Sequence, residues 1–203
     1  MTSTQTIDAI FQRTEAAELQ IPPDVLSSCA GYLDLLCTWN QRINLTALPL
    51  SPATPQAIDR LIVEPLVAAP YLEPDSAWAD LGSGGGSPAL PLKIARVQTS
   101  LTMVESKERK SAFLREAIRA LHVVRAGVFT GRFEDAELVG LDAVTIRAVK
   151  LDAGTVSVIG RMLRKDGLLM VFGSAHSWAG FIPEKTVPLP GAGSSTLLVL
   201  RKL

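Results

Sequence analysis

The chain has 203 residues, of which 47% are apolar and 20% charged, and its formal net charge is zero. This composition suits one large α/β unit with a sizeable hydrophobic core and argues against global disorder. A strong nucleic-acid binder usually carries a basic balance of charge, so any RNA contact has to come from a local patch.

The residues that could form a disulfide or bind a metal are few. Cys29 and Cys37 lie eight residues apart in a stretch with helical periodicity. That spacing is roughly 12 Å along a helix, beyond the Cα separation of about 7 Å that a disulfide allows. His122 and His176 are too scattered for a metal site. There is no signal-peptide pattern and no apolar run near the ~18 residues of a membrane helix. We therefore expect a cytoplasmic monomer with reduced thiols, no metal and no membrane contact.

Residues 1–72 predict a helical extension packed on the region that follows. A short apolar stripe precedes Pro23, which starts a second helix with apolar residues at helical spacing up to about Trp39. Residues 48–55 contain three prolines and predict a loop. The apolar segment Ala57–Leu72 contains Pro65, which should kink a helix or start a new one.

Residues 73–203 predict a region in which short strands alternate with amphipathic helices. The expected strands are Ala77–Leu81, Leu101–Val104, Val123–Phe129, Ala143–Ile146 and Leu168–Phe172. The expected helices are Pro88–Arg96, Lys107–Leu121 and Asp152–Arg164, with a helical turn near Glu134. This alternation indicates an α/β fold with a parallel sheet and helices on both of its faces.

The chain ends on two further strand-like runs, Lys185–Leu189 and Thr196–Arg201, joined by a turn-like linker at residues 190–194. Strands joined this closely should pair antiparallel. A mostly parallel, seven-stranded sheet that ends in an antiparallel hairpin is typical of the Rossmann-like fold of S-adenosylmethionine-dependent methyltransferases. A dinucleotide dehydrogenase half-domain does not end in this way.

A glycine-rich segment follows the first strand and precedes a helix, and residues 80–88 read Asp-Leu-Gly-Ser-Gly-Gly-Gly-Ser-Pro. Glycine allows a tight turn and lets backbone N–H groups approach a ligand. Glu105 ends the next strand, 19 residues after Gly86. An acidic side chain there can accept hydrogen bonds from both ribose hydroxyls of a nucleoside. The two features together predict a nucleoside cofactor at the carboxyl ends of the strands.

The loop reads G-x-G-x-G rather than the G-x-G-x-x-G of a dinucleotide fold, and Asp80 lies two residues before it. A carboxylate at that place would repel a pyrophosphate but favour the amino group or the sulfonium side of S-adenosylmethionine. The pattern favours this methyl donor and leaves a dinucleotide oxidoreductase as a weaker alternative.

The segment Trp39–Thr46 resembles the W-N-x-x-x-N-L-T signature of the small-subunit ribosomal RNA guanine-N7 methyltransferases, also called glucose-inhibited division protein B. The resemblance runs from about Leu26 to the C-terminus. It continues through the glycine loop, Val104–Ser106, the R-x-E of Arg132–Glu134 and the segment Ile146–Val149.

The resemblance implies an enzyme that transfers a methyl group from S-adenosylmethionine to a guanine of 16S ribosomal RNA in the small subunit, with residues 73–203 as its methyltransferase domain. The glycine loop would pass under the methionine part of the cofactor, Glu105 would hold the ribose, and Phe133 and Glu134 would flank the adenine. Arg147 would face the methyl-transfer site and is the candidate catalytic residue. The expected cofactor-binding residues are Asp80, Gly82, Ser83, Gly84, Gly86, Ser87, Glu105, Ser106, Phe133, Glu134 and Arg147.

Three stretches depart from the family pattern. An R-H-x-x-D-S stretch is replaced by Arg60–Pro65, so Leu61, Glu64 and Pro65 differ from the family residues. Ser87 stands where the family has a bulky apolar residue, and Phe172 where it has a lysine. These departures keep an alternative open, in which a divergent cofactor-binding protein with weak or absent catalysis serves as an RNA-binding or ribosome-assembly module.

Guanine N7 is already nucleophilic, so the reaction requires alignment rather than a strong general base, and the lack of a His or Cys constellation is compatible with it. For Arg147 the competing interpretation is a solvated arginine at a strand end. The basic residues of Lys107–Leu121 are interpreted as an exposed helix face with i, i+4 ion pairs, and Trp39 as a helix-packing residue.

Overall fold

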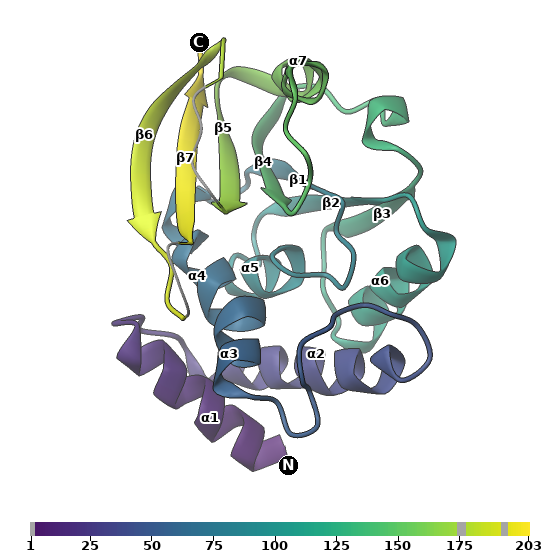
Figure 1. The fold of residues 1–203 in the computed structure, drawn as a ribbon, viewed down its shortest axis with the longest axis vertical. Coiled ribbons are helices and arrows are strands. Elements are labelled where there is room, and N and C mark those ends of the chain that lie inside the picture. Colours follow the sequence, from purple (N-terminus) through teal and green to yellow (C-terminus); the bar gives the residue numbers. More distant parts are fainter. Residues whose placement is uncertain (1–2, 174–177, 192–194) are drawn as a thin grey trace.

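The computed structural model describes residues 3–173, 178–191 and 195–203. Its centre is a seven-stranded sheet with the strand order β3-β2-β1-β4-β5-β7-β6 (Figure 1). The strands are β1 (Ala77–Leu81), β2 (Ser100–Glu105), β3 (Ala126–Thr130), β4 (Leu141–Arg147), β5 (Leu163–Gly173), β6 (Phe181–Pro188) and β7 (Thr196–Lys202).

The pairing confirms the predicted fold class. Strands β3, β2, β1, β4 and β5 are mutually parallel, so their carboxyl ends lie along one edge of the sheet. Strand β7 lies between β5 and β6 and pairs antiparallel with both, which is the predicted C-terminal hairpin. Residues 192–194 of the predicted linker lie outside the described residues.

Helices cover both faces of the sheet, as predicted. Helices α5 (Ala89–Ala95) and α6 (Glu108–Ala120) lie on one face, and α7 (Ala153–Met162) lies on the other (Figure 1). Because successive strand residues point to opposite faces, Trp78 of β1 joins the core under α5 and α6, whereas the next residue, Ala79, joins the core under α7.

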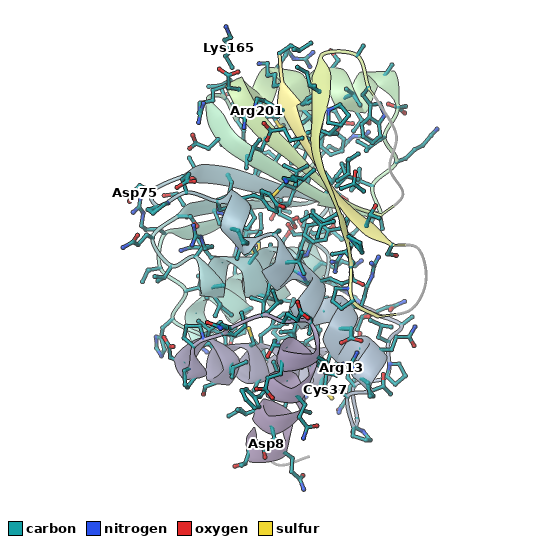
Figure 2. The ribbon with its side chains drawn as sticks, turned by 90° about the vertical axis from the view of Figure 1, so that its left-hand side faces the viewer. Asp8, Arg13, Cys37, Asp75, Lys165 and Arg201 are labelled. Atoms are coloured by element: carbon teal, nitrogen blue, oxygen red, sulfur yellow. The ribbon has the colours of Figure 1, made fainter. Side chains whose placement is uncertain are left out.

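The N-terminal residues form an additional layer of helices beyond α5 and α6. The segments are α1 (Ser3–Ala16), α2 (Pro23–Asn40), α3 (Pro55–Ile58), the π-helical η1 (Asp59–Val63), α4 (Glu64–Val67) and the 3₁₀ turn η2 (Ala69–Tyr71). Their buried side chains, such as Ile10 and Leu36, belong to the same hydrophobic cluster as Phe113 of α6 and Met170 of β5. Figure 2 shows this layer at one end of the molecule, with Asp8 near its tip and Lys165 at the opposite end.

Pro65 starts a new helical segment, as predicted, and it also changes the turn before it. The N–H of Glu64 donates to the carbonyl of Asp59, a π-helical bond, and Pro65 has no N–H to donate. The Glu64 N–H is already used and Pro65 has none, so the Arg60 carbonyl receives no hydrogen bond from the residue four or five positions later. The Leu61 carbonyl likewise lacks its usual donor, which would be the N–H of residue 65. Side chains from elsewhere in the fold donate to these two carbonyls instead, Arg147 to that of Arg60 and Ser87 to that of Leu61.

Three predicted strand starts were wrong by three residues or more, and one of them is that of β6, which begins at Phe181 rather than Lys185. β3 begins at Ala126 rather than Val123, because Val123 still donates to the Ile118 carbonyl and closes the end of α6. His122 takes the left-handed conformation (φ 52°) that such a helix end requires. β5 begins at Leu163 rather than Leu168, and α7 stops at Met162, since Leu163 already pairs with Leu141 before an irregularity in the ladder.

No helix among residues 3–173, 178–191 and 195–203 is both long and apolar enough to span a lipid bilayer. Within the same residues, no three or more His, Cys, Asp or Glu side chains gather as a metal site would need. Cys29 and Cys37 are both free thiols.

Candidate active site

The glycine loop connects β1 to α5 and is anchored to the neighbouring strand. The backbone N–H groups of Gly82 and Ser83 both donate to the Val104 carbonyl of β2, at 2.8 and 3.0 Å. Gly82, Gly84 and Gly86 have φ values of +75°, +52° and +86°, which side chains with a Cβ rarely adopt. A Cβ on Gly86 would also lie 2.6 Å from Leu90 Cδ1. The chain therefore needs glycine here for its path, independently of any ligand.

Glu105 closes the loop from the end of β2 and is nearly buried, with 6% of its surface exposed. Its Oε2 accepts the N–H of Gly84 at 2.9 Å, and its Oε1 accepts the N–H of Lys107 at 2.8 Å. Because an ionised carboxylate has about four acceptor sites, each oxygen can still accept one more hydrogen bond. The orientation of Glu105 is thus fixed by the protein, and two acceptor positions remain for a pair of ribose hydroxyls.

Asp80 lies at the base of the loop and is 1% exposed. Its Oδ1 accepts the hydroxyl of Thr145 from β4 at 2.6 Å, whereas its Oδ2 is buried with no hydrogen-bond partner in the described residues. Burial raises the pKa of this carboxyl above its ordinary value. A buried acceptor without a donor is costly, so the site fits a ligand that brings a donor or a positive charge. The amino group of S-adenosylmethionine is such a donor.

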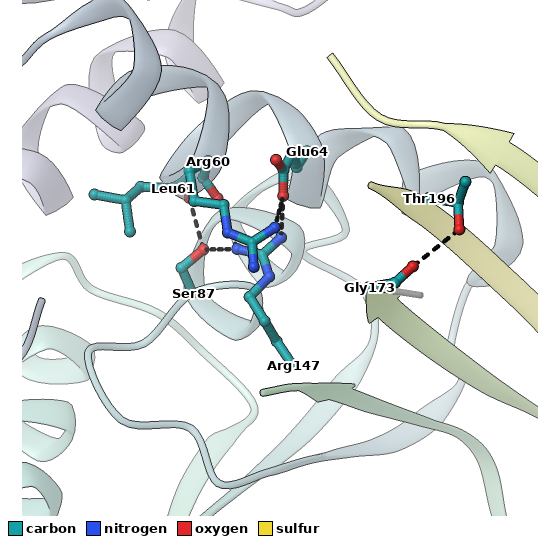
Figure 3. Close-up of polar contacts among 7 residues, drawn as sticks. All are labelled: Arg60, Leu61, Glu64, Ser87, Arg147, Gly173 and Thr196. Atoms are coloured by element: carbon teal, nitrogen blue, oxygen red, sulfur yellow. Dashed lines mark hydrogen bonds and ion pairs between the residues drawn. The ribbon is translucent and has the colours of Figure 1, made fainter. Parts of the chain in front are cut away.

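Arg147, at the end of β4, is buried rather than solvated, with 9% of its side chain exposed. Its Nη1 donates to the Arg60 carbonyl at 2.6 Å and to Ser87 Oγ at 3.1 Å, and its Nη2 donates to Glu64 at 3.0 Å (Figure 3). Its guanidinium carbon lies 4.6 Å from the ring centre of Phe172. Burial, followed by repulsion from Arg60, lowers the pKa of Arg147 to about 10. Its surroundings are mostly protein, so the interpretation as a solvated strand-end arginine was wrong.

The positions that depart from the family pattern meet around this arginine. Ser87 donates its hydroxyl to the Leu61 carbonyl at 2.9 Å, the acceptor that lacks its helical donor because Pro65 has no N–H. Glu64 bridges Arg147 and Arg60 (Figure 3). In this chain, Ser87 engages the carbonyl that Pro65 leaves without a helical donor, and Glu64 neutralises the buried Arg147.

Beside Arg147, a cavity of about 350 Å³ opens at the carboxyl ends of β4 and β5. Arg60, Val149, Phe172 and Trp178 are among its lining residues. Val149 also lies close to the glycine loop, since a Cβ on Gly82 would be 2.9 Å from its methyl group. The cavity therefore adjoins the loop. At the β5 side of its rim, the hydroxyl of Thr196 donates to the Gly173 carbonyl at 2.9 Å and ties β5 to β7 (Figure 3).

The remaining predicted site residues lie farther out on the same edge of the sheet. Ser106 is exposed directly after Glu105. Phe133 and Glu134 form a 3₁₀ turn (η3, Phe133–Asp135) after β3, the strand next to β2. Phe133 packs against the core under α7, while Glu134 forms an exposed ion pair with Arg132 at 3.0 Å. Two residues before this turn, the N–H of Gly131 donates to the Glu105 carbonyl at 3.1 Å.

Three contributors to the site are not evident from the sequence pattern. Thr145 orients Asp80, as described above. The hydroxyl of Tyr32 in α2 donates to the Gly85 carbonyl at 2.7 Å, so the helical layer contacts the glycine loop directly. Asn40 uses Oδ1 to accept the N–H groups of Leu45 and Thr46, at 2.8 and 3.0 Å, and its side-chain amide donates to the Thr46 carbonyl at 3.0 Å.

Asn40 explains the W-N-x-x-x-N-L-T segment as a folded turn. The turn presses Leu45 against the glycine loop, where a Cβ on Gly85 would lie 3.1 Å from the Leu45 carbonyl oxygen. Trp39 packs edge-on against Phe113, with ring centres 5.8 Å apart, which confirms it as a helix-packing residue. Asn40 belongs to the motif, but its role is not evident from the pattern, because only the fold shows which backbone groups its side chain binds.

Solved structures share the fold at low sequence identity. A methyltransferase from Geobacter sulfurreducens superposes with a TM-score of 0.60 at 16% identity, covering 84% of this chain and 90% of that one. An S-adenosylmethionine-dependent methyltransferase from Aquifex aeolicus gives a TM-score of 0.58 at 12% identity, covering 73% and 93% of the two chains.

Sequence relatives are much closer. A protein named ribosomal RNA small subunit methyltransferase G from Xanthomonas axonopodis pv. citri is 38% identical over 184 residues, 84% of each chain. A protein of the same name from Stenotrophomonas maltophilia is 41% identical over 180 residues, 83% of this chain and 82% of that one. The family described as rRNA small subunit methyltransferase G matches residues 26–179. The chain therefore belongs to the rRNA small subunit methyltransferase G family.

Proposed function

We propose that this chain transfers the methyl group of S-adenosylmethionine to N7 of a guanine in small-subunit ribosomal RNA. The family and the fold support a methyltransferase that uses this cofactor and acts on ribosomal RNA. The observation that carries the proposal is Asp80, a buried carboxylate with one unpartnered oxygen at the base of the glycine loop that Glu105 closes.

The cofactor end of the site follows from these two carboxylates. Asp80 would accept a hydrogen bond from the cofactor's amino group through Oδ2, and Glu105 would accept the ribose hydroxyls through its remaining lone pairs. The glycine loop would lie against the methionine part, where its bare backbone allows close approach. Ser106, Phe133 and Glu134 would border the adenine, since they follow the ends of β2 and β3. When bound, S-adenosylmethionine supplies an electrophilic methyl group on its sulfonium.

The acceptor end would be the cavity beside Arg147. Its walls include the aromatic rings of Phe172 and Trp178 and the cation of Arg60. Such a lining suits an unstacked base, which proteins hold by stacking and by a few polar contacts. Guanine N7 needs alignment with the methyl carbon and the sulfur, but no proton removal, so catalysis here would be positioning. Arg147 would act by fixing Ser87 of the glycine loop against the Arg60–Glu64 segment.

The direct test is methyl transfer by the purified protein from labelled S-adenosylmethionine to small ribosomal subunits that lack this methylation. We expect incorporation at a single guanine, identified by mapping the labelled RNA. Binding of S-adenosylhomocysteine without any transfer to small subunits or to free 16S RNA would contradict the proposal and favour the cofactor-binding module. The predicted cytoplasmic location and monomeric state stay predictions.

A further inference from the structure

A second pocket adjoins the cofactor end of the site. Its volume is about 540 Å³, and it lies between the turn after α2 and the start of α6. We define the basic pocket by its lining residues Arg42, Asn44, Ser106, Lys107, Arg109 and Lys110. Ser106 and Lys107 directly follow Glu105, and the backbone N–H of Lys107 donates to Glu105. The basic pocket therefore opens next to the expected ribose position.

The charge of the basic pocket is one-sided. Four cations line it, against the single carboxylate of Glu108. Within the part of the chain that the structure describes, the side chains of Arg42, Lys107, Arg109 and Lys110 have no hydrogen bond or ion pair. The expectation of i, i+4 ion pairs along this helix was therefore wrong at its N-terminal end, and the pair near its C-terminal end, between Glu116 and Arg119, is spaced i, i+3.

Cations elsewhere in the molecule are commonly paired. Arg13 is held by Asp59, Arg125 by Asp75 and Arg164 by Asp142. Within the described residues, this chain of zero net charge thus gathers four cations without a side-chain partner in one pocket, beside the expected cofactor site. Uncompensated like charges repel one another and weaken folding, unless an anion binds them.

The walls of the basic pocket are well supported. Arg42 and Asn44 belong to the turn that Asn40 holds through three hydrogen bonds. Lys107 is the N-cap residue of α6, and Arg109 and Lys110 lie in its first turn; the helix buries Phe113 and Leu114. The two sides are joined by the contact between Trp39 and Phe113. The backbone segments that carry the four cations are therefore held in place on both sides of the pocket.

The cofactor is a poor occupant for this charge. S-adenosylmethionine carries a sulfonium and no phosphate, and its adenosine part is neutral, so four cations would gain little from it. RNA backbone phosphate is the complementary group, because Lys and Arg that neutralise phosphates release bound counterions and increase affinity. We propose that the basic pocket binds the phosphate backbone of the ribosomal RNA substrate on the β2 side of the site, across β1 from the cavity that would take the target base. This inference rests on the proposed function for the identity of the RNA.

The test uses the double variant Arg42→Glu/Arg109→Glu, which reverses one exposed charge on each wall. Its matched control is Lys165→Glu/Lys185→Glu, the same charge change at exposed cations, with Lys165 at the opposite end of the molecule (Figure 2). Three quantities are measured: binding of small subunits by co-sedimentation at several salt concentrations, methyl transfer to them, and the affinity for S-adenosylhomocysteine by calorimetry.

We expect the Arg42/Arg109 variant to bind small subunits at least tenfold more weakly near 0.1 M salt, with a salt dependence shallower by about one unit per lost phosphate contact. Its affinity for S-adenosylhomocysteine should be unchanged, and the control should lose less than threefold in subunit binding. Unchanged subunit binding, an equal loss in the control, or a parallel loss of cofactor affinity would each overturn the inference. The wild-type protein could bind small subunits without transferring a methyl group, while the Arg42/Arg109 variant loses that binding. This pair of results would refute the proposed function but support RNA binding by the basic pocket.

Discussion

At the scale of single residues, the active site is marked by two buried charges that the protein satisfies only in part. Asp80 Oδ2 and Arg147 Nε are the buried side-chain atoms without a hydrogen-bond partner in the described residues. A buried charge is tolerated when its cost is offset by a partner or a function. For Arg147 the offset is visible in Glu64 and Phe172. For Asp80 the hydroxyl of Thr145 satisfies only one of the two carboxylate oxygens, so we expect the cofactor to supply a hydrogen-bond donor to the other.

Replacing Asp80 by asparagine should separate cofactor binding from stability. The variant keeps the acceptor for Thr145 but loses the charge that would meet the cofactor's amino group. Hydrogen bonds to charged groups contribute about 1.5–3 kcal/mol, so affinity for S-adenosylmethionine should fall at least tenfold by calorimetry. Without cofactor, the free energy of unfolding should rise at neutral pH, because the buried charge is gone.

The pH dependence of the same variant gives the control. Burial raises the pKa of Asp80 in the folded chain, so the folded state binds more protons than the unfolded state between the ordinary carboxyl pKa and the raised value. Stability from this group is therefore greatest below that window and falls as pH rises through it. Urea denaturation across the window should show a shallower fall for Asp80→Asn than for the wild type, and identical slopes would contradict the assignment.

Glu64 should matter for stability more than an exposed ion pair does. It bridges Arg147 and Arg60, and the side chains of Glu64 and Arg147 are 6% and 9% exposed. Removing one member of a buried pair leaves the other charge uncompensated, which typically costs about 3–5 kcal/mol. Glu64→Gln should lower the free energy of unfolding by that order. Glu184→Gln, which breaks the exposed pair with Arg201, should cost less than about 1 kcal/mol, and an equal loss in both variants would argue against the bridge.

At the scale of elements, the sequence pattern predicted the features that depend on local sequence and missed those that depend on contacts with distant segments. The alternation of strands and helices predicted the sheet, and Pro65 predicted a break in the helical segment. The π-helical turn before Pro65 was not predictable, because it depends on Arg147 and Ser87 engaging the freed carbonyls. The early start of β5 likewise depends on pairing of Leu163 with Leu141 across the sheet.

In the candidate site, too, some features could be predicted from the sequence and others depend on the fold. Asp80, Glu105 and the glycines are adjacent to strand ends in the sequence, and they lie together in the structure. The Arg60–Pro65 stretch, Ser87 and Phe172 are distant from one another in sequence, so their meeting around Arg147 required the fold. The unpaired state of Lys107, Arg109 and Lys110 also required it, since the sequence alone allowed ion pairs along α6.

The turn after α2 provides the prediction at this scale. Asn40→Ala removes the acceptor for two backbone N–H groups and the donor to the Thr46 carbonyl. A protein hydrogen bond contributes about 0.5–1.5 kcal/mol net, so losing these three part-buried bonds should lower the free energy of unfolding by about 1–3 kcal/mol. Cofactor affinity should also fall, because the turn presses Leu45 against Gly85. Asn44→Ala, the matched control, changes an exposed residue of the same motif and should stay within about 0.5 kcal/mol of the wild type; equal effects would refute this role.

At the scale of the whole molecule, the helical layer and the sheet share one core. Leu36 of α2, Leu66 of α4 and Met170 of β5 belong to a single hydrophobic cluster. The Tyr32 hydroxyl adds a polar link to the glycine loop. We propose that residues 1–72 and 73–203 form one cooperative structural unit, in which the helical extension is part of the scaffold that shapes the cofactor loop.

Hydrogen exchange measured by mass spectrometry tests whether residues 1–72 and 73–203 unfold as one cooperative unit. If the layers unfold together, the slowest amides of α2 and of β1 should exchange with the same free energy of opening, because both become accessible only when the shared core opens. Saturating S-adenosylhomocysteine should raise both values equally, by RT ln(1 + [L]/Kd), where [L] is the free ligand concentration. Tyr32→Phe, which removes only the bond to Gly85, should lower both together by about 1 kcal/mol. If α2 exchanges at a lower free energy than β1 and does not respond to the cofactor analogue, the extension is a separate unit and the glycine loop is shaped by the sheet alone.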